Sequence, residues 1–110
     1  MKPLRRLADS RRRIRRFPRP ARQRAGFELW EVQQGHDPSD WKPMPSVGEG
    51  VNEIRVHADG EHRVLYVAKF EEAVYVLHAF AKKTRRASKQ DIAAAAARFR
   101  ALVQERVRKR

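Results

Sequence analysis

Four basic side chains crowd together in the stretch HAFAKKTRR, residues 78–86, immediately after an apolar run. The cations that fall within five residues are Lys82, Lys83, Arg85 and Arg86. Like charges at this spacing repel one another, so the segment loses stability unless an anion lies opposite. Guanidinium and ammonium groups bind phosphate, and they stabilise the charge that develops during a reaction at phosphorus. The segment therefore predicts a phosphate-binding role.

The net charge of +13 is concentrated at the two ends of the chain. Residues 1–26 hold eleven Lys and Arg against one acid, and residues 82–110 hold eleven against two. Residues 27–81 are acidic, with four bases against ten acids. Basic surfaces of this kind favour a polyanionic partner, and nucleic acid is the first expectation, ahead of an anionic membrane surface.

Composition excludes several other classes of site. The chain has no cysteine, so it has no disulfide framework and no thiolate nucleophile, which suits a reducing cytoplasm. Its four histidines lack the spacing of metal ligands: His36, His57, His62 and His78. We therefore expect neither a metal nor a cofactor. A length of 110 residues predicts one domain over residues 1–110, and no apolar run is long enough to span a membrane.

The N-terminal part predicts a pair of helices. Pro18 breaks the helical pattern, and Gly35 provides a stop signal for the second helix. The expected elements are a short strand over 2–8, a basic helix from Asp9 or Ser10 to Phe17, and a helix from Pro20 to about Gln34. So short a link predicts a helical hairpin.

The rest of the chain predicts three strands and a last helix. Residues 36–50 are rich in proline and are expected to form a loop. The strands are expected at 51–57, 62–70 and 73–80, joined by short connections that make them antiparallel neighbours. Ser88, with Asp91 three residues later, predicts the cap of a helix with one apolar stripe: Ile92, Ala96, Phe99, Val103 and Val107.

Alternation along the strands assigns side chains to the two faces of the sheet. A two-residue turn at Glu71 and Glu72 would pair Arg63 with Phe80 and Leu65 with His78. The face expected against the helical hairpin then carries Ile54, Val56, Val64, Tyr66, Phe70, Tyr75 and Leu77. The opposite face carries a basic, histidine-containing concavity formed by Arg55, His57, Arg63, His78 and Lys82, beside apolar positions that the last helix would cover: Leu65, Val67, Val74 and Val76.

Several motifs, taken in their order along the chain, resemble the phage-derived branch of the RelE/HigB-like toxins of bacterial toxin–antitoxin systems. They are DWKPMPSVGEGVNEIRV, HRVLYVAKFEEAVYVLHAFAKKT and SKQDI. The resemblance implies an α+β fold of the RelE/ParE type. In that fold a small antiparallel sheet carries the N-terminal helical hairpin on one face, and the C-terminal helix partly covers the other.

The same resemblance implies an activity and partners. RelE-like toxins are metal-free endoribonucleases that cut mRNA in the ribosomal A site. The expected partners are therefore mRNA, the ribosome with its rRNA, and a helix-turn-helix antitoxin of the HigA-like type. The expected compartment is the cytoplasm.

Carried over by position, the resemblance assigns Arg63 to phosphate binding at the catalytic centre and Lys82 and Lys83 to the basic pair after the last strand. Arg55 falls near another basic position, and His57, Arg85 and Arg86 are expected to contact RNA. The family's tyrosine after the basic pair is missing from TRRASKQDI, residues 84–92. A base role would then fall to His78, to His57 or to a lysine, while clustered cations position the 2′-hydroxyl for in-line attack.

Each assignment has a structural alternative. Arg63 could be an exposed strand residue paired with Glu53 or Glu61, the basic run could be a solvated surface, and His78 could be a core histidine. Trp30 and Trp41 are expected to pack rather than to stack on bases. The alternative function is a non-enzymatic one: a ParE-like gyrase poison or an inert nucleic-acid-binding protein of the same fold. Arg63→Ala is expected to abolish cleavage and leave the fold intact.

Overall fold

A five-stranded sheet forms the centre of the molecule in the computed structural model, which describes residues 1–109. Its strands are β1 (Leu4–Arg6), β2 (Trp41–Pro43), β3 (Val51–His57), β4 (Glu61–Val67) and β5 (Val74–Ala81), and their order is β1-β5-β4-β3-β2. Neighbours from β5 to β2 are antiparallel, whereas β1 runs parallel to β5. The sheet is therefore mixed, which corrects the expectation of a purely antiparallel one.

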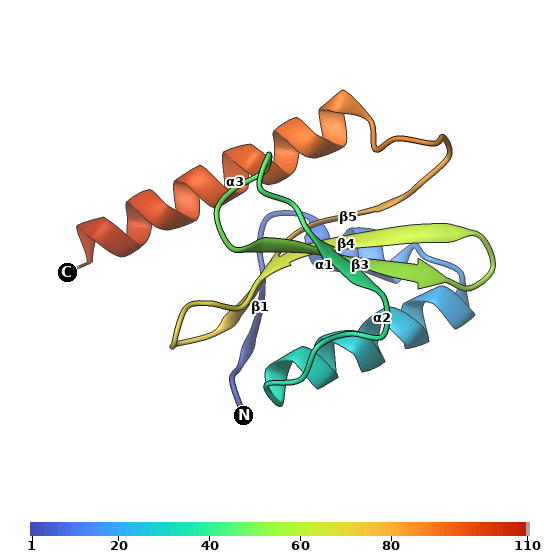
Figure 1. Cartoon of the computed structure of the whole chain (residues 1–110), viewed down its shortest axis with the longest axis horizontal. Helices are drawn as coiled ribbons and strands as arrows, with labels where there is room; N and C mark the ends of the chain where they lie inside the picture. The colour runs from blue at the N-terminus through green and yellow to red at the C-terminus, as the bar shows by residue number, and fades with distance from the viewer. Residues whose placement is uncertain (110) are drawn as a thin grey trace.

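Helices cover both faces of this sheet (Figure 1). The hairpin of α1 (Ser10–Arg15) and α2 (Arg19–Gln33) lies on one face, and α3 (Lys89–Arg108) crosses the other. Gly35, at φ 90°, follows α2 as predicted, because a residue without Cβ adopts this left-handed conformation at little cost. Ser88 caps α3 through a hydrogen bond of 3.1 Å from the Asp91 amide to its Oγ, which confirms that prediction. The α+β class is thus confirmed.

Two apolar clusters separate the helices from the sheet. The first joins α1 and α2 to residues that include Ile54, Val56, Val64 and Tyr66 of β3 and β4, as expected from their alternation. The second joins Ala95 and Leu102 of α3 to residues that include Leu65 and Val67. Burial of these side chains supplies most of the driving force for folding, at about 25 cal/mol per Å² of apolar surface.

A β-bulge changes the predicted faces of β5. The pairs Arg63 with Phe80 and Leu65 with His78 form as predicted, but the register then shifts by one residue, so that Tyr66 pairs with Val76. Val74 and Val76 consequently join the α2 side, and Tyr75 and Leu77 join the α3 side, the reverse of the prediction. The extra residue in β5 is the physical reason, because a one-residue shift exchanges the two faces.

The connection from β4 to β5 also differs from the predicted two-residue turn. β4 ends at Val67 and β5 begins at Val74, so Phe70 and Ala73 form no strand pair. Phe70 packs on the α3 side, not on the hairpin side as predicted. The Lys2 ammonium group donates hydrogen bonds to the carbonyl oxygens of Ala68 and Phe70, at 2.6 and 2.9 Å. These bonds satisfy backbone groups that leave the ladder where the connection bends away.

A short strand, β2, lies inside the segment expected to be a loop. Trp41 pairs with Ile54, and Pro43 pairs with Asn52. Proline is tolerated here because β2 is an edge strand, where a missing amide hydrogen breaks no interior ladder. The segment before it is fixed by Glu28 of α2, a buried carboxylate that accepts hydrogen bonds from the amide and the hydroxyl of Ser39. This contact positions Asp40, the next residue along the chain.

Candidate active site at the end of the sheet

The predicted basic residues come together on the α3 face of the sheet, at one end. Arg55 lies directly opposite Arg63, which in turn lies opposite Phe80. His57 lies opposite Glu61 at the tip of the β3–β4 hairpin. The amide of Lys82 donates a hydrogen bond of 2.8 Å to the carbonyl oxygen of Glu61, which places the basic segment beside the same end.

Arg63 occupies the middle of this group and is buried. Its residue is 5% exposed, although its neighbours on the hairpin tip are open to solvent. One guanidinium nitrogen, Nη1, lies 3.1 Å from Oε1 of Glu61, and Nε lies 3.8 Å from Oε1 of Glu53. Nε makes no hydrogen bond within the described chain. The expected partners of the structural alternative are thus both present, but the arginine is not an exposed strand residue.

Arg55 shares one of these carboxylates. Its Nε lies 3.5 Å from Oε1 of Glu53, and its Nη1 lies 4.0 Å from Asp40. Glu53 therefore lies between two arginines that face each other across the strands, and it relieves a like-charge pair that would otherwise destabilise the sheet. Three carboxylates, of Asp40, Glu53 and Glu61, offset most of the positive charge of the group. The basic, histidine-containing concavity that the sequence predicts therefore contains a network of ion pairs.

His57 lies between two carboxylates. Its Nε2 is 2.6 Å from Oδ2 of Asp40, and its Nδ1 is 2.8 Å from Oε2 of Glu61. Only the doubly protonated imidazolium can donate to both partners. The hydrogen bond with Asp40, followed by the one with Glu61, raises the pKa of His57 above its ordinary value. The hydrogen bond with His57 likewise lowers the pKa of Asp40 and that of Glu61.

We expect Asp40→Asn to lower the pKa of His57, because the variant replaces a carboxylate partner by a neutral amide. The measurement is a titration of the His57 ring protons by nuclear magnetic resonance, in wild type and in variant. Because the folded pKa is the higher one, the pairing stabilises the fold below the unfolded pKa of His57 and loses this effect as the pH rises through the folded pKa. His36 serves as the internal control, since its ring lies 3.5 Å from Glu31 and not in the network of His57. An unchanged His57 titration would contradict the assigned geometry.

His78 lies in the core, as one of its two predicted roles requires, and not at the surface where it could transfer a proton to a substrate. It is 1% exposed and lies between β5 and α3. Arg98 donates to Nδ1 at 2.9 Å, so the ring hydrogen is on Nε2 and is donated to Oδ1 of Asp91 at 2.7 Å. Burial lowers the pKa of His78 below its ordinary value and favours the neutral ring. With both nitrogens engaged, His78 is suited to positioning α3 and not to contacting a substrate.

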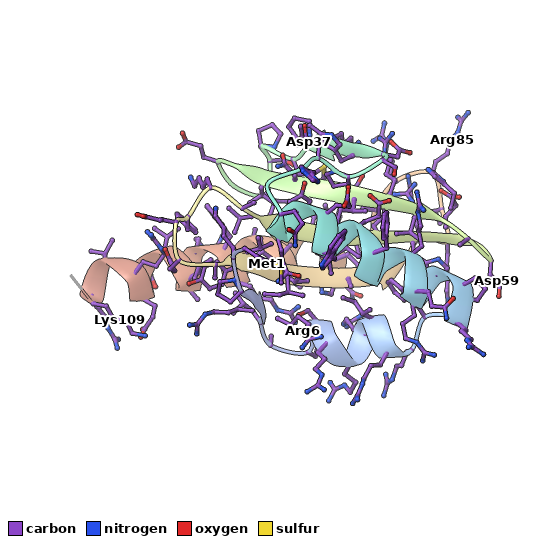
Figure 2. All side chains as sticks on the ribbon, turned by 90° about the horizontal axis from the view of Figure 1, so that it is seen from below. Met1, Arg6, Asp37, Asp59, Arg85 and Lys109 are labelled. Atoms are coloured by element: carbon purple, nitrogen blue, oxygen red, sulfur yellow. The ribbon has the colours of Figure 1, made fainter. Side chains whose placement is uncertain are left out.

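The basic segment itself leads from β5 into α3. Lys83, Arg85 and Arg86 are exposed, and Lys82 is half-buried. Within residues 1–109, no ion pair joins any of these four cations to a carboxylate. Figure 2 shows Arg85 projecting from the same end of the molecule as Asp59 of the hairpin tip, whereas Lys109 lies at the far end. The charges that remain free for an anion are therefore those of the segment, beside the ion-pair network.

Neither tyrosine of the chain reaches this end of the sheet. Tyr66 is a core residue as predicted, and burial raises its pKa to about 12. The Tyr75 hydroxyl donates to Glu72 at 2.9 Å, near the other end of β5. Among residues 1–109, no cluster of three His, Asp or Glu side chains could hold a metal ion.

One residue of the site was not predicted. Glu53 and Glu61 were named as possible partners of Arg63, and Asp40 completes the network. Asp40 comes from a loop 17 residues from His57, and no sequence spacing indicates this contact. Trp30, which was expected to pack rather than to stack on bases, is 47% exposed, and its ring centroid lies 6.1 Å from that of exposed Phe27.

Comparison with known proteins places the chain in a family. No curated protein matches it. Within residues 1–109, no helix is long and apolar enough to cross a membrane. A family model described as phage derived protein Gp49-like (DUF891) matches residues 12–100, which include strands β2 to β5, the basic segment and the first part of α3. The chain therefore belongs to the phage-derived Gp49-like family.

Proposed function

We propose that this chain is the toxin of a bacterial toxin–antitoxin pair and that it cleaves mRNA in the ribosomal A site without a metal. The observation that carries the proposal is the assembly of Arg63, the His57 imidazolium and Lys82 at one end of the sheet. Membership of a phage-derived family and the motifs that resemble RelE/HigB-like toxins support it. The toxin acts in the cytoplasm, and a helix-turn-helix antitoxin neutralises it.

These groups suit cleavage by the 2′-hydroxyl. The 2′-oxygen attacks phosphorus, the bond to the 5′-oxygen breaks, and a cyclic phosphate and a free 5′-hydroxyl remain. Arg63 and Lys82 stabilise the negative charge that develops on the phosphate oxygens. His57 holds a proton between two carboxylates and can give it to the departing 5′-oxygen.

The group that can remove the 2′-hydroxyl proton is a weak base. The Glu61 carboxylate is 45% exposed and lies beside both His57 and Arg63, so it is the nearest acceptor on the hairpin tip. Its lowered pKa makes it a poor base, because the hydrogen bond from His57 stabilises its charged form. Catalysis on this geometry therefore depends on charge stabilisation and in-line positioning more than on proton abstraction.

A phosphate that enters this site replaces the Glu61 carboxylate as a partner of Arg63. Arg63 lies 3.1 Å from Glu61, and the Glu61 side chain is 45% exposed, so water can replace the arginine as its partner. Glu53 is 4% exposed and stays paired with the two arginines. The free protein thus holds its catalytic arginine in place without substrate.

The three carboxylates also favour a second candidate. A group that is nearly neutral binds phosphate less strongly than the predicted cationic concavity would, and the free cations of residues 82–86 lie beside it. A non-enzymatic protein, either a gyrase poison of the ParE type or an inert nucleic-acid-binding protein, needs those free cations but no acid and no base. It is the alternative against which the nuclease is tested.

Mapping of mRNA 5′ ends after induction of the chain in cells separates the two candidates. The nuclease predicts new 5′ ends within coding sequences, and it predicts that Lys82→Ala removes them while Arg108→Ala, at the far end of α3, retains them. Growth arrest without new 5′ ends would refute the nuclease and would support the gyrase poison.

A further inference from the structure

Two small hollows adjoin at the end of β5. One, of about 160 Å³, lies between the strand end and the start of α3 and is lined by residues that include Lys82, Lys83 and Arg86. The other, of about 180 Å³, lies between the strand end and α1 and is lined by residues that include Arg13 and Arg16. Both are smaller than typical small-molecule sites. Phe80 and Ala81 line both of them, so the hollows lie on two sides of the same strand end.

The hollow beside α1 is basic because two arginines at the end of this helix line it. β1 pairs only with residues 74–76 of β5, and Arg13 and Arg16 line the hollow together with residues 79–81 farther along the strand. Arg13 and Arg16 are three residues apart, so they lie on one side of this short helix. Arg13 is held by the Asp9 carboxylate at 2.9 Å. Arg16 is exposed and forms no ion pair with any residue from 1 to 109.

A buried histidine also lines this hollow. His62 is 4% exposed and lines it, and the Nδ1 atom of its ring has no hydrogen-bond partner among residues 1–109. Leaving such a ring nitrogen unsatisfied costs free energy that a polar ligand or its hydration water would recover. The hollow therefore combines a free guanidinium group, a fixed one and an unsatisfied ring nitrogen.

We propose that the backbone of a single-stranded RNA crosses the end of β5 and places one phosphate at each hollow. The first phosphate contacts the cations of residues 82–86, and the second contacts Arg13 and Arg16. The inference rests on the proposed function for the identity of the polyanion. It adds a flanking binding site on α1, outside the group of His57, Arg63 and Lys82.

Salt dependence of binding tests this path. A labelled single-stranded RNA with 2′-O-methyl groups cannot undergo attack by the 2′-oxygen, so fluorescence anisotropy reports binding alone. We expect Arg16→Ala to weaken binding roughly tenfold at low salt. We also expect it to reduce the slope of log affinity against log salt by about 0.7, the value for one phosphate contact on a single strand. Lys83→Ala should do the same, and the double variant should lose about twice as much slope.

Arg108→Ala is the matched control, because it removes the same charge from the C-terminal end of α3, next to Lys109 at the far end of the molecule (Figure 2). Its slope should equal that of wild type. Equal slopes for Arg16→Ala and Arg108→Ala would overturn the proposed path, because binding would then depend only on the net charge of the protein. If the nuclease proposal alone is wrong, no new mRNA 5′ ends will be found, but Arg16→Ala will still reduce the salt slope of RNA binding.

Discussion

Arg63→Lys is expected to reduce mRNA cleavage by roughly a hundredfold or more while the chain stays folded. A guanidinium group presents five donors in a planar fork, whereas an ammonium group is a compact point charge. The lysine keeps the positive charge next to Glu53, but its donors all lie on one nitrogen, whereas Arg63 presents Nη1 to Glu61 and to the carbonyl oxygen of His62 and keeps a separate nitrogen for a phosphate. We expect the free energy of unfolding to change by only about 1 kcal/mol, because no buried charge loses its counter-charge.

Arg63→Ala does not test catalysis alone, because the structure indicates that this variant also destabilises the fold. Glu53 is 4% exposed, and removing Arg63 would leave its buried carboxylate with Arg55 alone, at 3.5 Å. Stranding one member of a buried pair costs about 3 to 5 kcal/mol. A small domain has only about 5 to 15 kcal/mol of stability, so loss of toxicity could then reflect unfolding. The expectation that Arg63→Ala leaves the fold intact is therefore revised.

Urea denaturation and 5′-end mapping on the same variants separate these effects. Arg55→Lys is the matched control, since the Arg55 side chain is 34% exposed and its change should affect both measurements less. A cleavage rate for Arg63→Lys within about threefold of wild type would mean that Arg63 does not contact the reacting phosphate.

Strand alternation was sufficient to predict which basic residues share a face. The stretch VNEIRVH alternates clearly, so Arg55 and His57 were assigned to one side and Ile54 and Val56 to the other. The pairing of Arg63 with Phe80 followed from the same pattern and is confirmed. These positions depend on local periodicity, which the sequence carries in full.

The bulge in β5 could not be predicted in this way. Residues 73–77, AVYVL, are all apolar, so they fit either register equally well. The site keeps its predicted pairs, because the residues after the bulge are in the predicted register and only those before it change face. A continuous apolar run indicates a buried strand, but it does not indicate which of its residues face which helix.

Sequence patterns also do not predict that carboxylates neutralise the basic residues of the site. Net charge was correctly placed at the two ends of the chain, yet the basic residues of the sheet come from its acidic middle segment. Glu53, Glu61 and Asp40 meet Arg55, Arg63 and His57 through strand pairing and a loop held by Glu28. Tertiary contacts of this kind have no fixed spacing, so a count of bases alone overestimated the free positive charge.

Asp91→Ala is expected to lower the free energy of unfolding by about 2 to 4 kcal/mol. Its Oδ1 accepts the Nε2 hydrogen of buried His78 at 2.7 Å, and its Oδ2 accepts the Ser88 hydroxyl hydrogen at 2.7 Å. The first bond joins α3 to β5, and the second belongs to the helix cap. The variant leaves a buried ring donor unsatisfied and weakens the cap at the same time. A urea denaturation curve measures the loss.

Ser88→Ala separates the two contributions, because it removes the cap and leaves the bond between Asp91 and His78 in place. Loss of an N-cap side chain costs about 1 kcal/mol, so this variant should be clearly more stable than Asp91→Ala. Residues 82–88 lie between β5 and this contact, and their cations need a fixed start of α3 to face a phosphate. Asp91→Ala should therefore also reduce cleavage more than Ser88→Ala does, at a temperature where both are folded. Equal stability of the two variants would show that the bond to His78 contributes nothing, and the position of the basic segment would then have to be set by its own residues.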